Sequence, residues 1–283
     1  MTAVRAPRGG IVPGLALAEV AALVPPPLAA FGDRVAAGPG GPTARPASTL
    51  RERAVFDAAI AAFGEPFGAA DRRAVVSYWT QFYLAALVIP ALTGLAHFGR
   101  ALPLGLDEID FELDEAGCLA RFLVPEAPRI REGSSQNGLA TLVEGHLRPF
   151  VELCHTHSGL ARRVLWGNVA VIVDRTAEEL AAVGAAAPAL IETATLLGWR
   201  ARRDASGTEG ASVRQGAGPM PDCAAIAHGS RSPLADTLRA VGPDGGRCRR
   251  VCCLRYRLPG VADCGALCPA VRRPDTARTD RPC

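Results

Sequence analysis

Lysine is missing from this chain of 283 residues, in which all 31 basic residues are arginine. In a sequence so rich in alanine, glycine and proline, we interpret this usage as a consequence of genome composition rather than of function. The net charge of +3 is too small to predict nucleic-acid binding by itself. The chain also lacks a P-loop and a glycine-rich phosphate-binding motif, so the sequence does not indicate a nucleotide-binding enzyme.

A secretory signal is not evident either. The apolar N-terminal stretch is interrupted by Glu19 and by prolines, and it lacks the order of charged, apolar and cleavage regions that such a signal requires. The nine cysteines are odd in number and gather toward the C-terminus, unlike the disulfide framework of a small secreted protein. We therefore expect a cytoplasmic protein, because clustered cysteines in a reducing compartment usually serve metal or redox chemistry.

One stretch without formal charge raises the question of a membrane span. It comprises the 26 residues between Arg73 and Arg100, which is enough to cross a bilayer. It also contains several polar residues, and Pro90 lies inside it, where a proline tends to break a helix. We interpret the stretch as a buried helix of a soluble core, or as two helices broken near Pro90.

Apolar spacing predicts a mainly helical protein with one hairpin. Ile109, Phe111 and Leu113 alternate with polar residues, and the apolar run resumes after the turn signal Asp-Glu-Ala-Gly, which is typical of a β-hairpin over 107–126. The other periodic segments have helical spacing. These helices are predicted at about 15–24, 51–64, 71–99, 136–157, 160–182 and 184–200.

Composition divides the chain into five segments. Residues 1–50 are rich in proline, alanine and glycine, 203–222 are predicted to form a linker, and 271–283 are predicted to be a disordered tail. Residues 51–202 are predicted as a helical domain and 223–270 as a small cysteine module. The expected fold class is therefore α+β, mainly α-helical, with one β-hairpin and a C-terminal cysteine module.

Four cysteines of this module lie within 17 residues: the adjacent pair Cys252 and Cys253, then Cys264 and Cys268. A unit this small cannot bury enough apolar surface alone, so it needs a metal, disulfides or a larger body to dock on. Zinc ligands are usually paired two residues apart, and adjacent side chains diverge rather than converge on one ion. An iron–sulfur cluster offers its ligand positions over a wider body, and the Pro-Gly at 259–260 supplies a bend. From spacing alone an iron–sulfur cluster, a zinc ion, and inert or disulfide-forming thiols all stay open.

The segment "CCLRYRLPGVADCGALCP" resembles the C-terminal module of the siderophore ferric-iron reductases, the FhuF-like family. In that family a Cys-Cys-x10-Cys-x2-Cys pattern binds a [2Fe–2S] cluster. The stretches "YWTQFYLAALVIPAL" at 78–92 and "HSGLARRVLWGNVA" at 157–170 are similar to two helices of the same family. The resemblance implies a [2Fe–2S] cofactor whose ligands are Cys252, Cys253, Cys264 and Cys268.

The last cysteine departs from the family pattern. Three residues separate Cys264 from Cys268 where the pattern has two. A bulge in the Gly-Ala turn between them can absorb the extra residue. Cys248 is the nearest substitute if Cys268 is not the fourth ligand.

The resemblance further implies an enzyme, a ferric-siderophore reductase that transfers one electron to the Fe³⁺ of an imported siderophore of the hydroxamate type. Hard oxygen donors hold Fe³⁺ better than Fe²⁺, so reduction weakens the chelate and releases iron. The implied partners are the ferric siderophore and an electron donor of the ferredoxin or flavin type, with no nucleic acid. A peripheral position at the inner membrane stays open.

Several residues outside the cysteines are candidates for contacts. Trp166 and Asn168, at the end of the second similar helix, are predicted to line the chelate pocket. Positive charge beside the cysteines would favour a reduced, more anionic cluster and attract an acidic electron donor. The arginines in question are Arg249, Arg250, Arg255 and Arg257, with Arg255 and Arg257 as the contact candidates.

An alternative function belongs to a different class. The same sequence is compatible with a non-enzymatic siderophore- or partner-binding protein that carries a structural zinc in the cysteine module. Visible absorption distinguishes the two, because an iron–sulfur protein is coloured and a zinc protein is not.

Overall fold

The computed structural model describes residues 17–99, 101–124, 138–185, 187–198, 232–241 and 246–269. The predicted linker at 203–222 and tail at 271–283 lie outside these residues, as do the first 16 residues of the chain. Within the described ranges the chain forms mostly helices, with one four-stranded and one two-stranded sheet. The predicted α+β, mainly α-helical class is confirmed.

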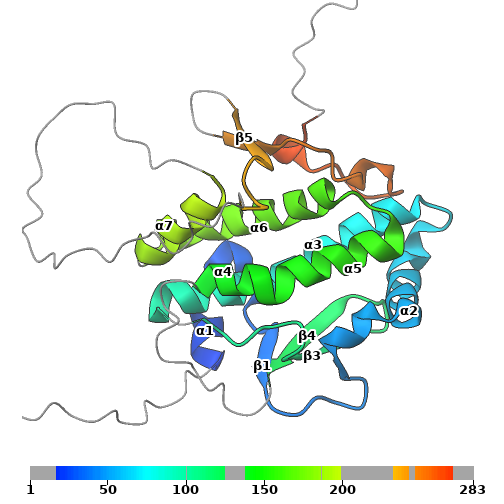
Figure 1. Cartoon of the computed structure of the whole chain (residues 1–283), viewed down its shortest axis with the longest axis horizontal. Helices are drawn as coiled ribbons and strands as arrows, with labels where there is room; N and C mark the ends of the chain where they lie inside the picture. Colours follow the sequence, from blue (N-terminus) through cyan, green and yellow to red (C-terminus); the bar gives the residue numbers. More distant parts are fainter. Residues whose placement is uncertain are drawn as a thin grey trace, which may run out of the picture.

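The helices lie close to their predicted ranges, since their apolar stripes identify them in the sequence. The largest, α3 and α6, pack against each other at the centre of the molecule (Figure 1). The seven are α1 (Leu17–Leu23), α2 (Arg53–Gly64), α3 (Arg72–Phe98), α4 (Gly138–Leu142), α5 (Arg148–Ser158), α6 (Arg162–Ala182) and α7 (Ala187–Leu196).

Helix α3 is the core of the fold. The Asp71 carboxylate accepts a hydrogen bond of 2.9 Å from the backbone N–H of Arg73 and caps the helix, and Gly99, at a φ of +63°, ends it. By length and composition α3 could cross a membrane, but 78% of its most apolar window is buried inside the protein. It is therefore a core helix, as predicted. Of the two interpretations of this stretch, the single helix is confirmed and the break at Pro90 is wrong, because α3 continues through this residue within a buried environment.

The segment predicted as one helix at 136–157 contains a wider turn. Helix α4 passes into a π-helical turn at Val143–Leu147 before α5 begins. Pro149, in the first turn of α5, has no N–H to donate to the preceding turn. His146 lies in the π turn and is fully buried.

The predicted hairpin is the centre of the four-stranded sheet. Strands β3 (Asp110–Leu113) and β4 (Leu119–Val124) are antiparallel, with Phe111 opposite Phe122. The outer strands come from the N-terminal segment and were not predicted. Strand β1 (Val35–Ala37) is parallel to β4, and β2 (Arg45–Pro46) is antiparallel to β3.

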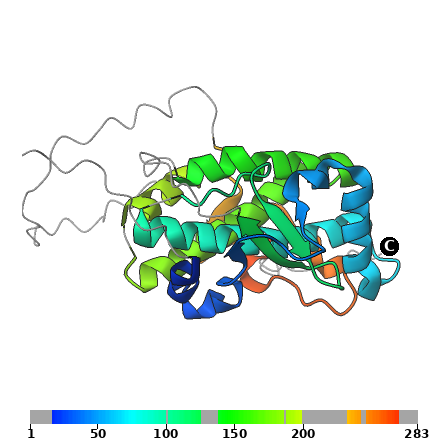
Figure 2. The ribbon, with the colours of Figure 1, turned by 90° about the horizontal axis from the view of Figure 1, so that it is seen from below.

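The sheet and the C-terminal segment lie on opposite sides of the helical layer. Figure 1 shows β1, β3 and β4 below the helices and the orange C-terminal segment above them, and Figure 2 views the molecule from the sheet side. The C-terminal segment begins with the antiparallel strands β5 (Leu238–Val241) and β6 (Gly246–Arg249). Leu234, Leu238 and Leu258 of this segment belong to the same apolar core as α3 and α6. The cysteine module is therefore docked on the helical body.

Candidate functional site

The cysteine segment leaves β6 along a path of tight turns. Leu254 has a φ of +62°, so the chain reverses directly after Cys253. Gly260, at a φ of +72°, forms the bend that the Pro-Gly pair predicts. A 3₁₀ turn at Gly265–Leu267 then joins Cys264 to Cys268, so the extra residue of this gap is taken up by a regular turn.

These turns gather four thiols. The sulfurs of Cys253 and Cys264 lie 3.8 Å apart and share a hydrogen bond. The Cys252 sulfur accepts a hydrogen bond of 3.4 Å from the backbone N–H of Leu254. Cys268 is near enough to affect the pKa values of Cys252 and Cys264 through its charge. The structure thus brings Cys253 and Cys264 into contact, with Cys252 and Cys268 in their neighbourhood.

The surroundings of Cys252, Cys253 and Cys264 shift their pKa values in different directions. The hydrogen bond with Cys264 and the positive charge of Arg249 lower the pKa of Cys253 to about 5, against the effect of burial. The same hydrogen bond raises the pKa of Cys264, and burial raises the pKa of Cys252. The group thus favours a first thiolate at Cys253, the form in which cysteine binds metal.

Cys248, the predicted substitute for Cys268, lies on the other face of β6. Its sulfur is buried and accepts a hydrogen bond of 3.1 Å from Nε of Arg239 on β5. Successive residues of a strand point to opposite faces, so Cys248 and Arg249 point in opposite directions. Arg249 is the one whose charge acts on the thiols.

A buried polar network connects the thiols with the helical body. Arg249 is 2% exposed, and its Nη1 donates a hydrogen bond of 2.6 Å to Oδ1 of Asn168 on α6. The Asn168 amide nitrogen donates to the Ser77 carbonyl oxygen and to the Thr80 hydroxyl on α3, at 2.9 and 3.0 Å. The Ser77 hydroxyl in turn donates to the Cys253 carbonyl oxygen at 2.7 Å. Helix α3 therefore holds the backbone of a predicted ligand directly, and α6 holds the side chain of Arg249.

The structure accounts for the Leu-Trp-Gly-Asn stretch of α6. Trp166 is buried in the core, and a Cβ at Gly167 would lie 3.8 Å from Nη1 of Arg249, so the guanidinium passes over this glycine. Asn168 has its amide engaged by Arg249 and by α3. Both Trp166 and Asn168 are thus covered by neighbouring residues, and their contact with a siderophore stays a prediction.

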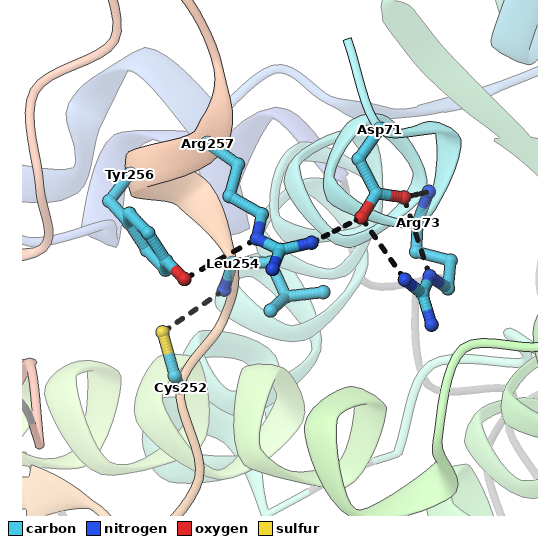
Figure 3. Close-up of polar contacts among 6 residues, drawn as sticks. All are labelled: Asp71, Arg73, Cys252, Leu254, Tyr256 and Arg257. Atoms are coloured by element: carbon cyan, nitrogen blue, oxygen red, sulfur yellow. Dashed lines mark hydrogen bonds and ion pairs between the residues drawn. The ribbon is translucent and has the colours of Figure 1, made fainter.

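Of the arginines predicted as contacts, Arg257 is exposed and Arg255 is half-buried. The guanidinium of Arg255 lies over the Tyr78 ring, 5.0 Å from its centroid. Arg257 donates to the Asp71 carboxylate at 2.6 Å and to the Tyr256 hydroxyl at 3.3 Å, as Figure 3 shows. Tyr256 is 60% exposed. This part of the module presents a basic and aromatic surface that a partner could reach.

Sequence reasoning missed Ser77 and Thr80. Both are polar residues three positions apart inside an otherwise apolar helix, and that pattern was the only available signal. The sequence also offered no reason to distinguish Arg249 from the other three arginines beside the cysteines. Arg249 is buried because it lies on β6, where its side chain contacts Asn168 of α6.

The thiols can be compared with the ligand geometry that a metal centre needs. The 3.8 Å between the Cys253 and Cys264 sulfurs suits two thiolates on one tetrahedral metal with bonds of about 2.3 Å. Within the described part of the chain, however, no three His, Cys, Asp or Glu side chains are close enough to share one metal ion. A contacting pair of thiols with two more cysteines nearby, beside a buried cation, is compatible with a larger anionic group such as an iron–sulfur cluster.

Comparison with known proteins supports the predicted resemblance. Residues 77–202 match the family model described as "ferric iron reductase FhuF-like transporter". The chain is also 25% identical over 203 residues to a protein of Escherichia coli (strain K12) named "ferric siderophore reductase", an alignment that covers 71% of this chain and 68% of that protein. The matched family region comprises most of α3 and all of α6, and it ends before the cysteine segment.

Proposed function

The chain is related to the FhuF-like siderophore ferric-iron reductases through residues 77–202, and on this basis we propose that it reduces the ferric iron of an imported siderophore. The proposed cofactor is a [2Fe–2S] cluster. Its proposed ligands are Cys252, Cys253, Cys264 and Cys268.

The contact between the Cys253 and Cys264 thiols, on a chain similar to a reductase, carries this proposal. Such a cluster, when bound, supplies a carrier of one electron close to the protein surface. The position of Cys248 on the opposite face of β6 supports Cys268 as the fourth ligand. The hydrogen bond from Ser77 and the buried Arg249 support a fixed place for the thiols against α3 and α6.

The proposed reaction is a transfer of one electron without acid, base or nucleophile. An external donor of the ferredoxin or flavin type is oxidised by one electron, and the Fe³⁺ of the chelate is reduced to Fe²⁺. Hydroxamate oxygens release Fe²⁺ more readily than Fe³⁺, because they are hard donors. The residues proposed to receive donor or substrate are the exposed Tyr256 and Arg257, together with Arg255.

The proposed location is the cytoplasm. Thiols stay reduced there, and an imported chelate must be reduced there before its iron is used. The helix that could span a membrane by composition is buried in the core, which supports a protein that does not use it as an anchor.

Iron and acid-labile sulfide analysis of purified protein tests the cofactor and its ligands. We expect a red-brown protein with about two irons and two sulfides per chain, and loss of the cluster in each of the variants Cys252→Ser, Cys253→Ser, Cys264→Ser and Cys268→Ser. Cys248→Ser tests whether Cys248, rather than Cys268, is the fourth ligand, and we expect this variant to keep its cluster. Cys118→Ser, in the distant hairpin, is the matched control and should keep a full cluster.

Three results would contradict parts of the proposal. A colourless protein with one zinc would instead support the non-enzymatic binding protein. A cluster that survives Cys268→Ser and disappears with Cys248→Ser would make the ligand set wrong. The activity itself is tested with a ferric hydroxamate and a chemical reductant of the cluster, where a loaded protein that leaves the iron ferric contradicts the reaction.

A further inference from the structure

Arg249 is a buried arginine without an anionic partner among the described residues. Its only hydrogen bond there goes to the neutral amide of Asn168, and its Nε is buried with no acceptor. Burying an unpaired guanidinium is costly, because the charge loses its hydration and gains nothing in exchange. A buried position of this kind therefore indicates that a negative charge lies close to it in the working protein.

The groups that face Arg249 are thiols. The ionisable groups that could supply a negative charge to it are Cys252, Cys253 and Cys264, while the nearby cation Arg255 acts against it. Arg255 also has a buried Nε without an acceptor. Among the described residues neither cation is ion-paired with a carboxylate, and thiols in their neutral form cannot compensate this charge.

We propose that Arg249 is the buried counter-charge of the cysteine-bound cluster and that it raises the reduction potential of that cluster. The inference rests on the proposed cofactor and extends it to the residue that adjusts its redox chemistry. Arg249 acts on the cluster through its charge and does not contact the siderophore, so it is a positioning residue.

The direction of the effect follows from charge. An oxidised [2Fe–2S] cluster with four thiolates is a dianion, and adding one electron makes it a trianion. A fixed positive charge stabilises the trianion more than the dianion and so favours the reduced form. At 2% exposure Arg249 is hardly screened by salt, whereas its exposed neighbour Arg250 is screened strongly.

Asn168 holds the guanidinium in place. Its amide nitrogen is committed to the Ser77 carbonyl oxygen and the Thr80 hydroxyl, so its oxygen must face Arg249. An aspartate at this position would put a carboxylate next to Arg249 and cancel its charge without removing the side chain. Asn168→Asp therefore tests the charge independently of Arg249→Met.

The experiment is a spectroelectrochemical titration of purified, cluster-loaded protein, with iron and sulfide content measured first. We expect lower midpoint potentials for Arg249→Met and for Asn168→Asp, and values close to wild type for Arg249→Lys, which keeps the charge. Arg250→Gln is the matched control on the adjacent, exposed residue and should leave the potential unchanged. A residue that only supported the fold would not move the potential of a fully loaded cluster.

Loaded Arg249→Met protein with an unchanged potential overturns the inference, as does a shift of equal size in Arg250→Gln. If the Arg249→Met protein does not bind a cluster, the midpoint potential of Asn168→Asp tests the inference by the same criterion. If neither variant binds a cluster, a full cluster in Arg249→Lys supports the need for a positive charge at this position, and an absent cluster in Arg249→Lys overturns the inference. Wild-type protein without iron and sulfide overturns the proposed cofactor itself, which is a different result from loaded variants with unchanged potentials.

Discussion

Ser77 and Cys253 are separated by 176 residues in the sequence, and in the structure the Ser77 hydroxyl donates a hydrogen bond of 2.7 Å to the Cys253 carbonyl oxygen. Both groups are buried. The same Ser77 offers its carbonyl oxygen to Asn168, whose side chain holds Arg249. The middle of α3 is thus the point at which the helical body fixes the cysteine segment.

Replacing Ser77 by alanine should destabilise the protein and loosen the cysteine segment. The buried Cys253 carbonyl oxygen would lose its donor, which costs about 2 kcal/mol of unfolding free energy. Urea unfolding measures this change, and the rate of cluster loss to a chelator should increase in parallel. Thr195→Ala is the control, because that hydroxyl bonds only within its own exposed helical turn and should cost under about 0.5 kcal/mol. Equal losses in both variants would contradict the anchoring role of Ser77.

His146 should make the protein sensitive to acid. Burial lowers its pKa to about 4, while the unfolded chain has the ordinary value near 6.5. Between pH 6.5 and pH 4 the unfolded state therefore binds a proton at His146 and the folded state does not, so the free energy of unfolding decreases as the pH falls through this range. The loss reaches about 3 kcal/mol at pH 4.

The difference between wild type and His146→Gln isolates this effect. Asp174, whose pKa burial raises to about 7, acts in the opposite direction over the same pH range and contributes equally to both proteins. Urea unfolding at pH 7, 5.5 and 4 should show the advantage of wild type over the variant shrinking by about 3 kcal/mol. A difference that does not depend on pH would show that His146 does not titrate as described.

Two glycines with the same backbone angle should differ in their tolerance of alanine. Gly117 and Gly260 both have a φ of +72°. A Cβ at Gly117 would lie 2.6 Å from the Phe63 backbone nitrogen and 2.8 Å from the Ala59 carbonyl oxygen, whereas one at Gly260 meets nothing within 4 Å. Gly260→Ala should cost about 1 kcal/mol for its left-handed backbone, and Gly117→Ala at least about 3 kcal/mol. Thermal unfolding of the two variants checks this, and similar costs would contradict it.

Arg257 should affect the encounter with an acidic electron donor. Its guanidinium lies at the surface beside the cysteine segment, paired with Asp71 (Figure 3). Arg257→Gln should slow cluster reduction by an acidic ferredoxin several-fold at low ionic strength, because attraction steers the encounter. The difference should vanish near 1 M salt, where the screening length is about 3 Å.

Arg148→Gln provides the matched control for this measurement. Arg148 is also ion-paired, and its side chain is 42% exposed against 44% for Arg257, but it lies at the start of α5. Its replacement should leave the rate unchanged at every salt concentration. An equal loss in both variants would mean that net charge alone, and no local surface, governs the encounter.

The sequence predicted correctly those helices, strands and turns that depend on neighbouring residues. The apolar periodicity of α2, α3 and α6 and the alternation in the β3–β4 hairpin depend on neighbouring residues, and such patterns can be read directly. The bend at Gly260 is equally local, because it needs only a residue that tolerates a positive φ. The family resemblance came from the cysteine spacing and from two helix motifs, and the match over residues 77–202 supports the helix motifs.

The parts that the sequence did not reveal depend on distant partners. Strands β1 and β2 have three and two residues, too few for a pattern, and they exist because β4 and β3 present free edges to them. The continuity of α3 through Pro90 is likewise a result of packing, which outweighs the local preference of proline to break a helix.

By itself the sequence determined a mainly helical body, one hairpin and a candidate set of four cysteine ligands, because spacing along the chain carries that information. The tertiary structure alone decided that β6 turns Arg249 inward and Cys248 away, and that Asn168 and Ser77 hold the module on α3 and α6. Four arginines beside the cysteines look alike in a sequence. Burial separates Arg249 from the exposed Arg250 and Arg257, since water and salt screen the charges of those two and hardly screen that of Arg249.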